Sequence, residues 1–140
     1  MAEIKRLPNW PELLAGKIDA ARKQPFVWGK NDCCLFAAHC VEIMTGVDLA
    51  GDYRSYKTKA EALRMLKKYG GVAGVAEAIA KKHEIPEIPP LIAQRGDVCL
   101  FDIGSGDTLG VIAGEHIFAP GQDGLIGFPL QQAVRAWRIG

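Results

Sequence analysis

Cys33 is the residue of this 140-residue chain whose type and position best suit a nucleophile. It directly follows Asp32, whose short acidic side chain is a good helix N-cap, so Cys33 is predicted to lie in the first turn of a helix. Backbone N–H groups and the helix dipole favour an anion there, which lowers the pKa of a thiol and favours the reactive thiolate. Cysteine is also a common small buried residue, so the same position is compatible with simple packing.

The remaining cysteines and the glycines give no sign of a metal or cofactor. Cys33 and Cys34 are adjacent and cannot easily bond each other, and the spacing of all four cysteines does not resemble a secreted disulfide framework. A zinc site usually has paired ligands at short intervals, whereas the cysteines at 33, 34 and 40 and His39 share one predicted helix and face several directions. The run 104–107, Gly-Ser-Gly-Asp, lacks the lysine of a phosphate-binding loop and predicts a turn. We therefore expect free thiols, no metal and no cofactor.

Composition excludes several classes of function. Hydrophobic residues make up 49% and charged residues 24%, as in a folded globular protein, and the formal net charge of +1 argues against a nucleic-acid binder. The longest apolar runs are too short to span a bilayer, so no membrane insertion is expected. The start, MAEIKRLPNW, has charges and no apolar core, so we expect no secretion signal and synthesis in the reducing cytoplasm.

The elements that must position Cys33 are helices first and strands later. Helical spacing and capping residues predict helices from Asn9, with Glu12 reaching back to the cap, to about Lys23, from Asp32 to Gly46, from Thr58 to Gly70 and over about 72–82. Short β-rich runs separated by glycine and aspartate then predict an antiparallel meander. This order predicts one α+β domain over residues 1–140. The expected strands are 98–103, 109–113, 116–119, 124–128 and 136–139, and the inward face of the second helix is expected to carry Cys33, Phe36, Ala37, Cys40, Val41 and Met44.

Three segments resemble the papain-like, NlpC-type cysteine peptidases. Residues 26–33, FVWGKNDC, are similar to the segment that leads into the nucleophile helix of that superfamily, and 95–101, RGDVCLF, and 109–114, LGVIAG, are similar to its next two strands, in the same order. The chain is still more similar to a phage and prophage family of short proteins without an assigned function. The shared motifs of that family lie at 28–33, 45–48, 95–97, 109–111, 119–125 and 136–138.

The resemblance implies a papain-like fold, in which the helix that starts at Asp32-Cys33 packs on a C-terminal antiparallel sheet. Cys33 would be the nucleophile, with Trp28 and Asp32 lining the cleft. In active members a histidine precedes the hydrophobic-Gly-Ile strand and acts as the base, but that position is Thr108 here, which cannot accept a proton at neutral pH. The neighbouring Asp107 could orient a water if its loop bends, but a carboxylate is a poor partner for a thiol.

None of the three histidines is an obvious replacement. His39 is displaced from Cys33 by about 9 Å along the predicted helix and turned about 120° away. His116 is expected to oppose Ala113 across a hairpin turn, which leaves it about 16 Å from position 108. His83 has the sequence context of a solvated helix end. The ordinary Cys–His pair is therefore expected to be missing.

Three hypotheses follow. The first is a degenerate peptidase-like domain that serves as a tail-tip or tail-assembly component of a phage or prophage, enters the virion tail, and contacts other tail proteins through exposed apolar loops such as 119–129. The second is a working thiol hydrolase that cleaves peptidoglycan stem peptides or related amides with Cys33 and an oxyanion hole of backbone N–H groups. The third is a module that keeps the cleft and binds a small molecule or peptide without turnover. Because the expected base is missing, the first hypothesis is favoured. An enzymatic role stays open as the alternative.

Overall fold

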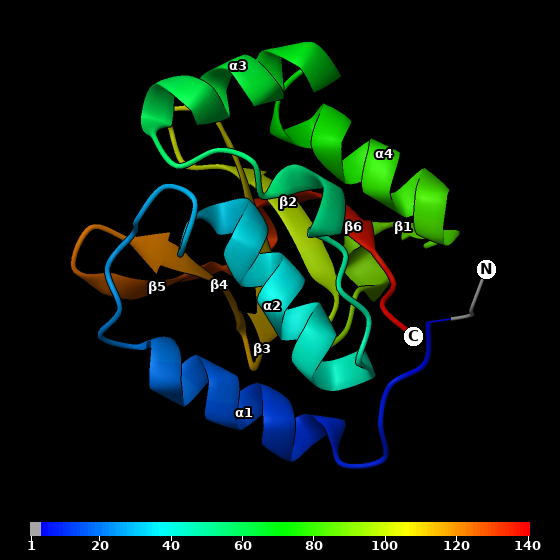
Figure 1. Cartoon of the computed structure of the whole chain (residues 1–140). Coiled ribbons are helices and arrows are strands. Elements are labelled where there is room, and N and C mark those ends of the chain that lie inside the picture. The colour runs from blue at the N-terminus through cyan, green and yellow to red at the C-terminus, as the bar shows by residue number, and fades with distance from the viewer. Residues whose placement is uncertain (1–3) are drawn as a thin grey trace.

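Helices cover one face of an antiparallel sheet, as Figure 1 shows. The computed structural model describes residues 4–140, so residues 1–3, on which part of the signal-peptide and domain expectations rested, lie outside it. Helix α2 crosses the centre of the view in front of the sheet, with α1 below it and the pair α3 and α4 above. The α-helices are α1 (Trp10–Ala21), α2 (Cys33–Thr45), α3 (Lys59–Tyr69) and α4 (Val72–His83).

Most of the helix boundaries follow the predicted caps. The Asp32 carboxylate accepts from the Leu35 backbone N–H at the start of α2, and Gly46 ends that helix in the left-handed conformation with φ 80°. Thr58 caps α3 in the same way. The predicted side-chain cap of α1 is wrong: Asn9 makes no capping hydrogen bond, because its backbone (φ −100°, ψ 24°) is not in the extended region from which a cap side chain reaches the first turn.

The sheet has six antiparallel strands in the order β1-β6-β2-β3-β4-β5. The meander β2 to β5 was predicted, and Ala113 pairs with His116 as expected. The final strand begins at Ala133 and not at Ala136, because it pairs along both β1 and β2. The two-residue strand β1 was not predicted. The bounds are β1 (Glu87–Ile88), β2 (Val98–Asp102), β3 (Asp107–Ala113), β4 (His116–Gly121), β5 (Gly124–Pro129) and β6 (Ala133–Trp137).

Both faces of the sheet bury apolar side chains. The face under α2 carries Val98, Leu100 and Val111, and the opposite face buries a smaller cluster around Phe101 and Ile112. Five of the six residues predicted for the inward face of α2 are buried, while Cys33 is half-buried at the helix tip. The core therefore fixes α2 on the sheet and leaves its first residue at the border of the packed region. Those buried residues are Phe36, Ala37, Cys40, Val41 and Met44.

A buried ion pair ties the two ends of the described chain to the sheet. Asp97, in the turn before β2, is 2% exposed and accepts from the Arg6 guanidinium at 2.9 Å, from the Gln94 N–H at 2.8 Å and from the Ile139 N–H at 3.0 Å. The Arg6 side chain also donates to the carbonyl oxygen of Ile139 at 2.6 Å. Asp97 is therefore a turn residue that also joins segments distant in sequence.

Replacement of Asp97 tests this tie. We expect Asp97→Ala to lower the free energy of unfolding by about 3 kcal/mol, because it leaves the Arg6 charge and two backbone N–H groups without their acceptor. The measurement is urea denaturation followed by far-UV circular dichroism. The matched control is Asp19→Ala, which removes an exposed carboxylate paired with Arg22 and should change stability far less. Equal losses in the two variants would contradict the structural role of Asp97.

Candidate functional site: a thiol cleft at the tip of α2

The residues that the sequence singled out meet in one cleft of about 430 Å³ at the N-terminus of α2. The segment before α2 supplies Trp28 and Asp32, the first residue of α2 is Cys33, and the start of β3 supplies Asp107 and Thr108. Apolar side chains of α3 and of the β4–β5 hairpin complete the wall. They include Ala62, Leu63, Met65, Leu66, Ala119, Pro120 and Phe128.

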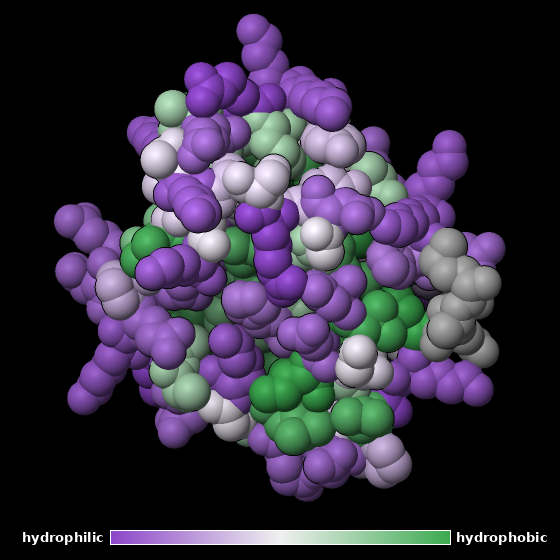
Figure 2. All heavy atoms as spheres, viewed as in Figure 1, coloured by the Kyte–Doolittle hydropathy of each residue, from purple (hydrophilic) through white to green (hydrophobic). Residues whose placement is uncertain are grey.

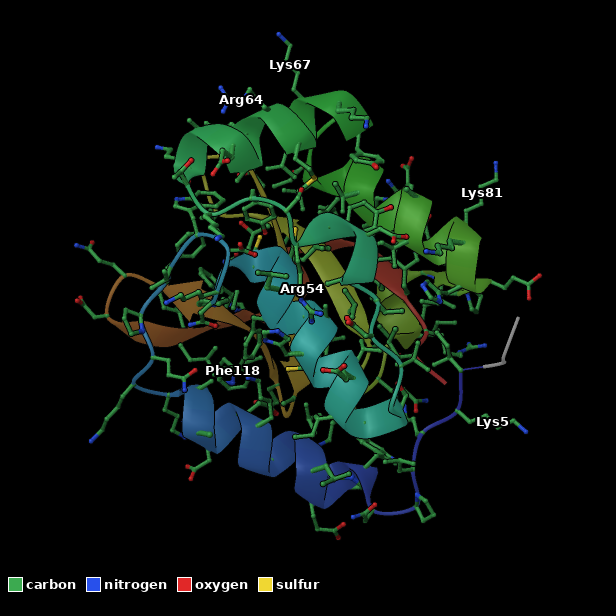
Figure 3. All side chains as sticks on the ribbon, in the orientation of Figure 1. Lys5, Arg54, Arg64, Lys67, Lys81 and Phe118 are labelled. Atoms are coloured by element: carbon green, nitrogen blue, oxygen red, sulfur yellow. The ribbon has the colours of Figure 1, made fainter. Side chains whose placement is uncertain are left out.

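Helix α3 has mostly apolar side chains on the side that faces the cleft and charged side chains on the side that faces solvent (Figure 3). Arg64 and Lys67 point outward from the helix, away from the body of the protein (Figure 3). Figure 2 shows hydrophilic side chains over this part of the surface, with smaller apolar patches elsewhere on the same face. The residues of α3 that line the cleft are apolar apart from Lys59, which belongs to the first turn. The cleft is thus an apolar hollow with few charged groups.

Asp32 is a structural residue of the cleft floor. Its carboxylate is 1% exposed and accepts three hydrogen bonds: from the Leu35 N–H at 2.9 Å, from the Gly29 N–H at 3.0 Å and from the Tyr56 hydroxyl at 2.5 Å. Three donors around a buried carboxylate satisfy its charge and hold the start of α2 in place. The predicted capping role of Asp32 is confirmed, since its carboxylate accepts from the Leu35 N–H at the start of α2.

Tyr56 joins the loop after α2 to this floor. Burial, together with its hydrogen bond to Asp32, raises the pKa of the Tyr56 phenol well above its usual range, so the hydroxyl stays protonated and donates. Gly29 lies against the same loop: its φ is +79°, and a Cβ there would lie 2.6 Å from the Tyr56 carbonyl oxygen. Nothing in the local sequence pattern around Tyr56 reveals a partner 24 positions earlier in the chain.

The two adjacent thiols of the cleft differ in acidity. The pKa of Cys33 is lowered, chiefly by a hydrogen bond from the Cys34 side chain and further by the backbone of Leu109, against the opposing effects of burial and of the Asp32 charge. The pKa of Cys34 is raised well above the usual thiol value by that same hydrogen bond and by burial. Of the two thiols, Cys33 is therefore the one that ionises more readily, and Cys34 is the one that keeps its proton.

The other two thiols are parts of the core. Cys40 and Cys99 are fully buried, and burial raises the pKa of each to about 12. All four cysteines are free thiols. Of the four, Cys33 alone has a lowered pKa, and it also lines the cleft.

No histidine lines this cleft. His39 lies beside Lys17 and Glu42 at a separate hollow on the α1 side of α2. His83 is the last residue of α4, and His116 is an exposed residue at the far end of β3 and β4. Thr108, where the resembled peptidases carry their base, lies in the cleft and is 9% exposed. Within residues 4–140 no group of three or more potential ligands could hold a metal ion, and no helix is long and apolar enough to cross a bilayer.

The first prediction for this site concerns stability. Tyr56→Phe removes one donor from the buried Asp32 carboxylate and should lower the free energy of unfolding by about 2 kcal/mol, as expected for a hydrogen bond to a charged group. Tyr53→Phe, in the same segment, is the control, since Tyr53 is partly exposed and its ring packs against Tyr69. Urea denaturation of both variants is the measurement. A Tyr56→Phe protein as stable as the Tyr53→Phe control would refute the role given to the hydroxyl.

The second prediction concerns reactivity. Iodoacetamide should label Cys33 before the other three cysteines, and the rate should rise with pH through an inflection below that of an ordinary thiol. Cys34→Ala should move this inflection to higher pH, because it removes the hydrogen bond that contributes most to the lowered pKa of Cys33. Cys40→Ala is the control and should leave the profile unchanged. Peptide mapping by mass spectrometry gives both site and rate, and an unmoved inflection in Cys34→Ala would disprove the thiol pairing.

Comparison with known proteins places the chain in a family. A family model described as a domain of unknown function (DUF6950) matches residues 5–139. No curated protein matches the sequence. The match includes every residue named above as part of the cleft. The chain therefore belongs to the DUF6950 family.

Proposed function

We propose that this protein is an NlpC-type, papain-like domain that has kept the thiol cleft and lost the general base, and that it serves as a tail-tip or tail-assembly component of a phage or prophage. The observation that carries the proposal is a cleft with a helix-tip thiol and no imidazole among its lining residues. The α+β order and the position of Cys33 in the first turn of α2 are compatible with the fold that the resemblance implies.

Ordinary peptide hydrolysis in this cleft would lack a proton carrier. Cleavage of an amide by a thiolate requires a group that protonates the leaving amine and later deprotonates a water. Thr108 cannot do either at neutral pH, and Cys34 holds its proton too tightly to exchange it readily. Asp107 lies exposed in the lining of the cleft, and a carboxylate there is a poor partner for a thiol nucleophile.

The tail-associated role rests on the resemblance. The expectation that residues 119–129 form an exposed apolar loop for contacts with tail proteins is wrong. Residues 119–129 are not an exposed apolar loop: they form most of the β4–β5 hairpin, and Ala119 and Pro120 in it are buried. Ile126, 45% exposed on the edge strand β5, is the large apolar side chain that this hairpin presents to solvent. Contacts with other tail proteins would therefore involve a strand edge and not a loop.

The proposal predicts no cleavage and physical association with a tail. Purified protein incubated with peptidoglycan stem peptides should release no product detectable by mass spectrometry, and particles assembled in the host should contain the protein in their tail fraction. Release of product that Cys33→Ala abolishes would overturn the proposal, and so would absence of the protein from purified tails. Cys40→Ala is the control thiol variant.

A working thiol hydrolase is the second candidate. The lowered pKa of Cys33 and the hydrogen bond from the Leu109 backbone favour it, because backbone donors near a nucleophile can also stabilise an oxyanion. Such an enzyme would have to draw its proton carrier from the substrate or from a partner protein. The cleavage assay above, repeated with tail particles present, separates this candidate from the first.

A further inference from the structure

We propose that Cys33 accepts apolar acyl groups from thioester donors, and that the acyl tail occupies a second, apolar hollow behind Cys34. This inference rests on the cleft described under the proposed function and names the chemistry and the ligand class that it suits.

The first step is chemical. A thiolate attacks a thioester carbonyl, the new carbon–sulfur bond forms on Cys33, and the donor sulfur leaves as a thiolate with the electron pair of the broken bond. A thiolate is a far better leaving group than an amide nitrogen, so exchange needs no acid to protonate it. The missing imidazole therefore disfavours amide cleavage and does not hinder acyl exchange between thiols.

The second step is geometric. The Cys34 side chain lines the Cys33 cleft and also an inner hollow of about 50 Å³ between α2, α4 and the sheet. Apart from the Cys34 thiol and the Trp137 indole, the lining of the inner hollow is aliphatic. The hollow exists because positions 37, 38, 76 and 80 carry the small side chain of alanine. A hollow without polar partners holds no well-bound water, so an aliphatic chain is the ligand it suits. Cys34 thus separates the reactive thiol from a site for the end of that chain.

The lining of the Cys33 cleft is largely apolar as well. Aromatic rings flank the thiol, with Phe26 and Trp28 edge to face at 4.7 Å between ring centroids. Of the three charged residues in the lining, Asp32 is already satisfied by three donors, and Lys59 and Asp107 are exposed. An aliphatic acyl group on Cys33 would therefore meet no unsatisfied buried charge in the cleft, and Cys34 is the residue that the linings of the cleft and the inner hollow share.

The test uses the full chain with acetyl, butanoyl and octanoyl thioesters of N-acetylcysteamine. Intact-mass spectrometry should show one acyl group per chain, peptide mapping should place it on Cys33, and hydroxylamine should remove it. Each methylene that the hollow accommodates should raise acylation efficiency by about fourfold, so octanoyl transfer should exceed acetyl transfer at least tenfold. Equal rates across the series, or an adduct on another residue, would overturn the inference.

A pair of variants tests the inner hollow. Ala80→Leu places a larger side chain in its lining and should reduce octanoyl transfer about tenfold while acetyl transfer stays unchanged. Ala78→Leu, on the same helix but outside both linings, is the matched control and should leave both rates unchanged. Octanoyl transfer unaffected by Ala80→Leu would refute the tail site.

Iodoacetamide labelling separates failure of this inference from failure of the proposed function. Rapid labelling of Cys33 with no chain-length preference would overturn the acyl site and leave the baseless thiol cleft intact. Slow labelling of Cys33 would overturn the acyl site, which needs a reactive thiol, and would leave the proposed tail role, which does not. Cleavage of stem peptides would overturn the proposed function and leave the acylation result to stand on its own.

Discussion

The buried carboxylate of Asp32 is the group on which the candidate site depends. A charge that is 1% exposed is tolerated only where hydrogen bonds replace its lost hydration, and here three donors come from three places in the chain: the first turn of α2, the tight turn at Gly29 and the loop that carries Tyr56. These bonds fix the position of the helix start. Cys33 is the next residue, so its thiol inherits that fixed position at the edge of the cleft.

The same arrangement separates structural from chemical roles among neighbouring residues. Asp32 raises the pKa of Cys33 through its charge, and Cys34 and the Leu109 backbone more than offset this through hydrogen bonds. The result is an acidic thiol whose nearest proton partner is another thiol. That combination differs from a Cys–His pair, because Cys34 can donate a hydrogen bond but does not readily carry a proton away. It is suited to reactions in which both the nucleophile and the leaving group are thiolates.

Distant packing supports this local chemistry. Helix α2 lies on the sheet through fully buried side chains such as Phe36 and Met44, and the ion pair between Arg6 and Asp97 holds the segment before α1 against the end of β6 and the turn before β2. The cleft is bordered by the segment before α2, by α3, by the start of β3 and by the β4–β5 hairpin. Its apolar α3 wall and its β3 border come together only because the meander brings Thr108 beside the tip of α2.

The sequence by itself determined the α+β class, the four helices, the four-strand meander and the cap that places Cys33 in a first turn. These features depend on local signals: Asp32 three residues before the N–H from which it accepts, Gly46 directly after the last residue of α2, and short β-rich runs separated by glycine and aspartate. Only the tertiary structure decided the partners of those residues. The Tyr56–Asp32 hydrogen bond, the α3 wall, the placement of β6 between β1 and β2 and the inner hollow behind Cys34 join residues far apart in sequence, and no local pattern encodes such pairings. The lowered pKa of Cys33 depends on both the sequence and the tertiary structure. Its position at the start of a helix predicts that the pKa is lowered, but the hydrogen bonds from Cys34 and Leu109 that lower it form only in the folded chain.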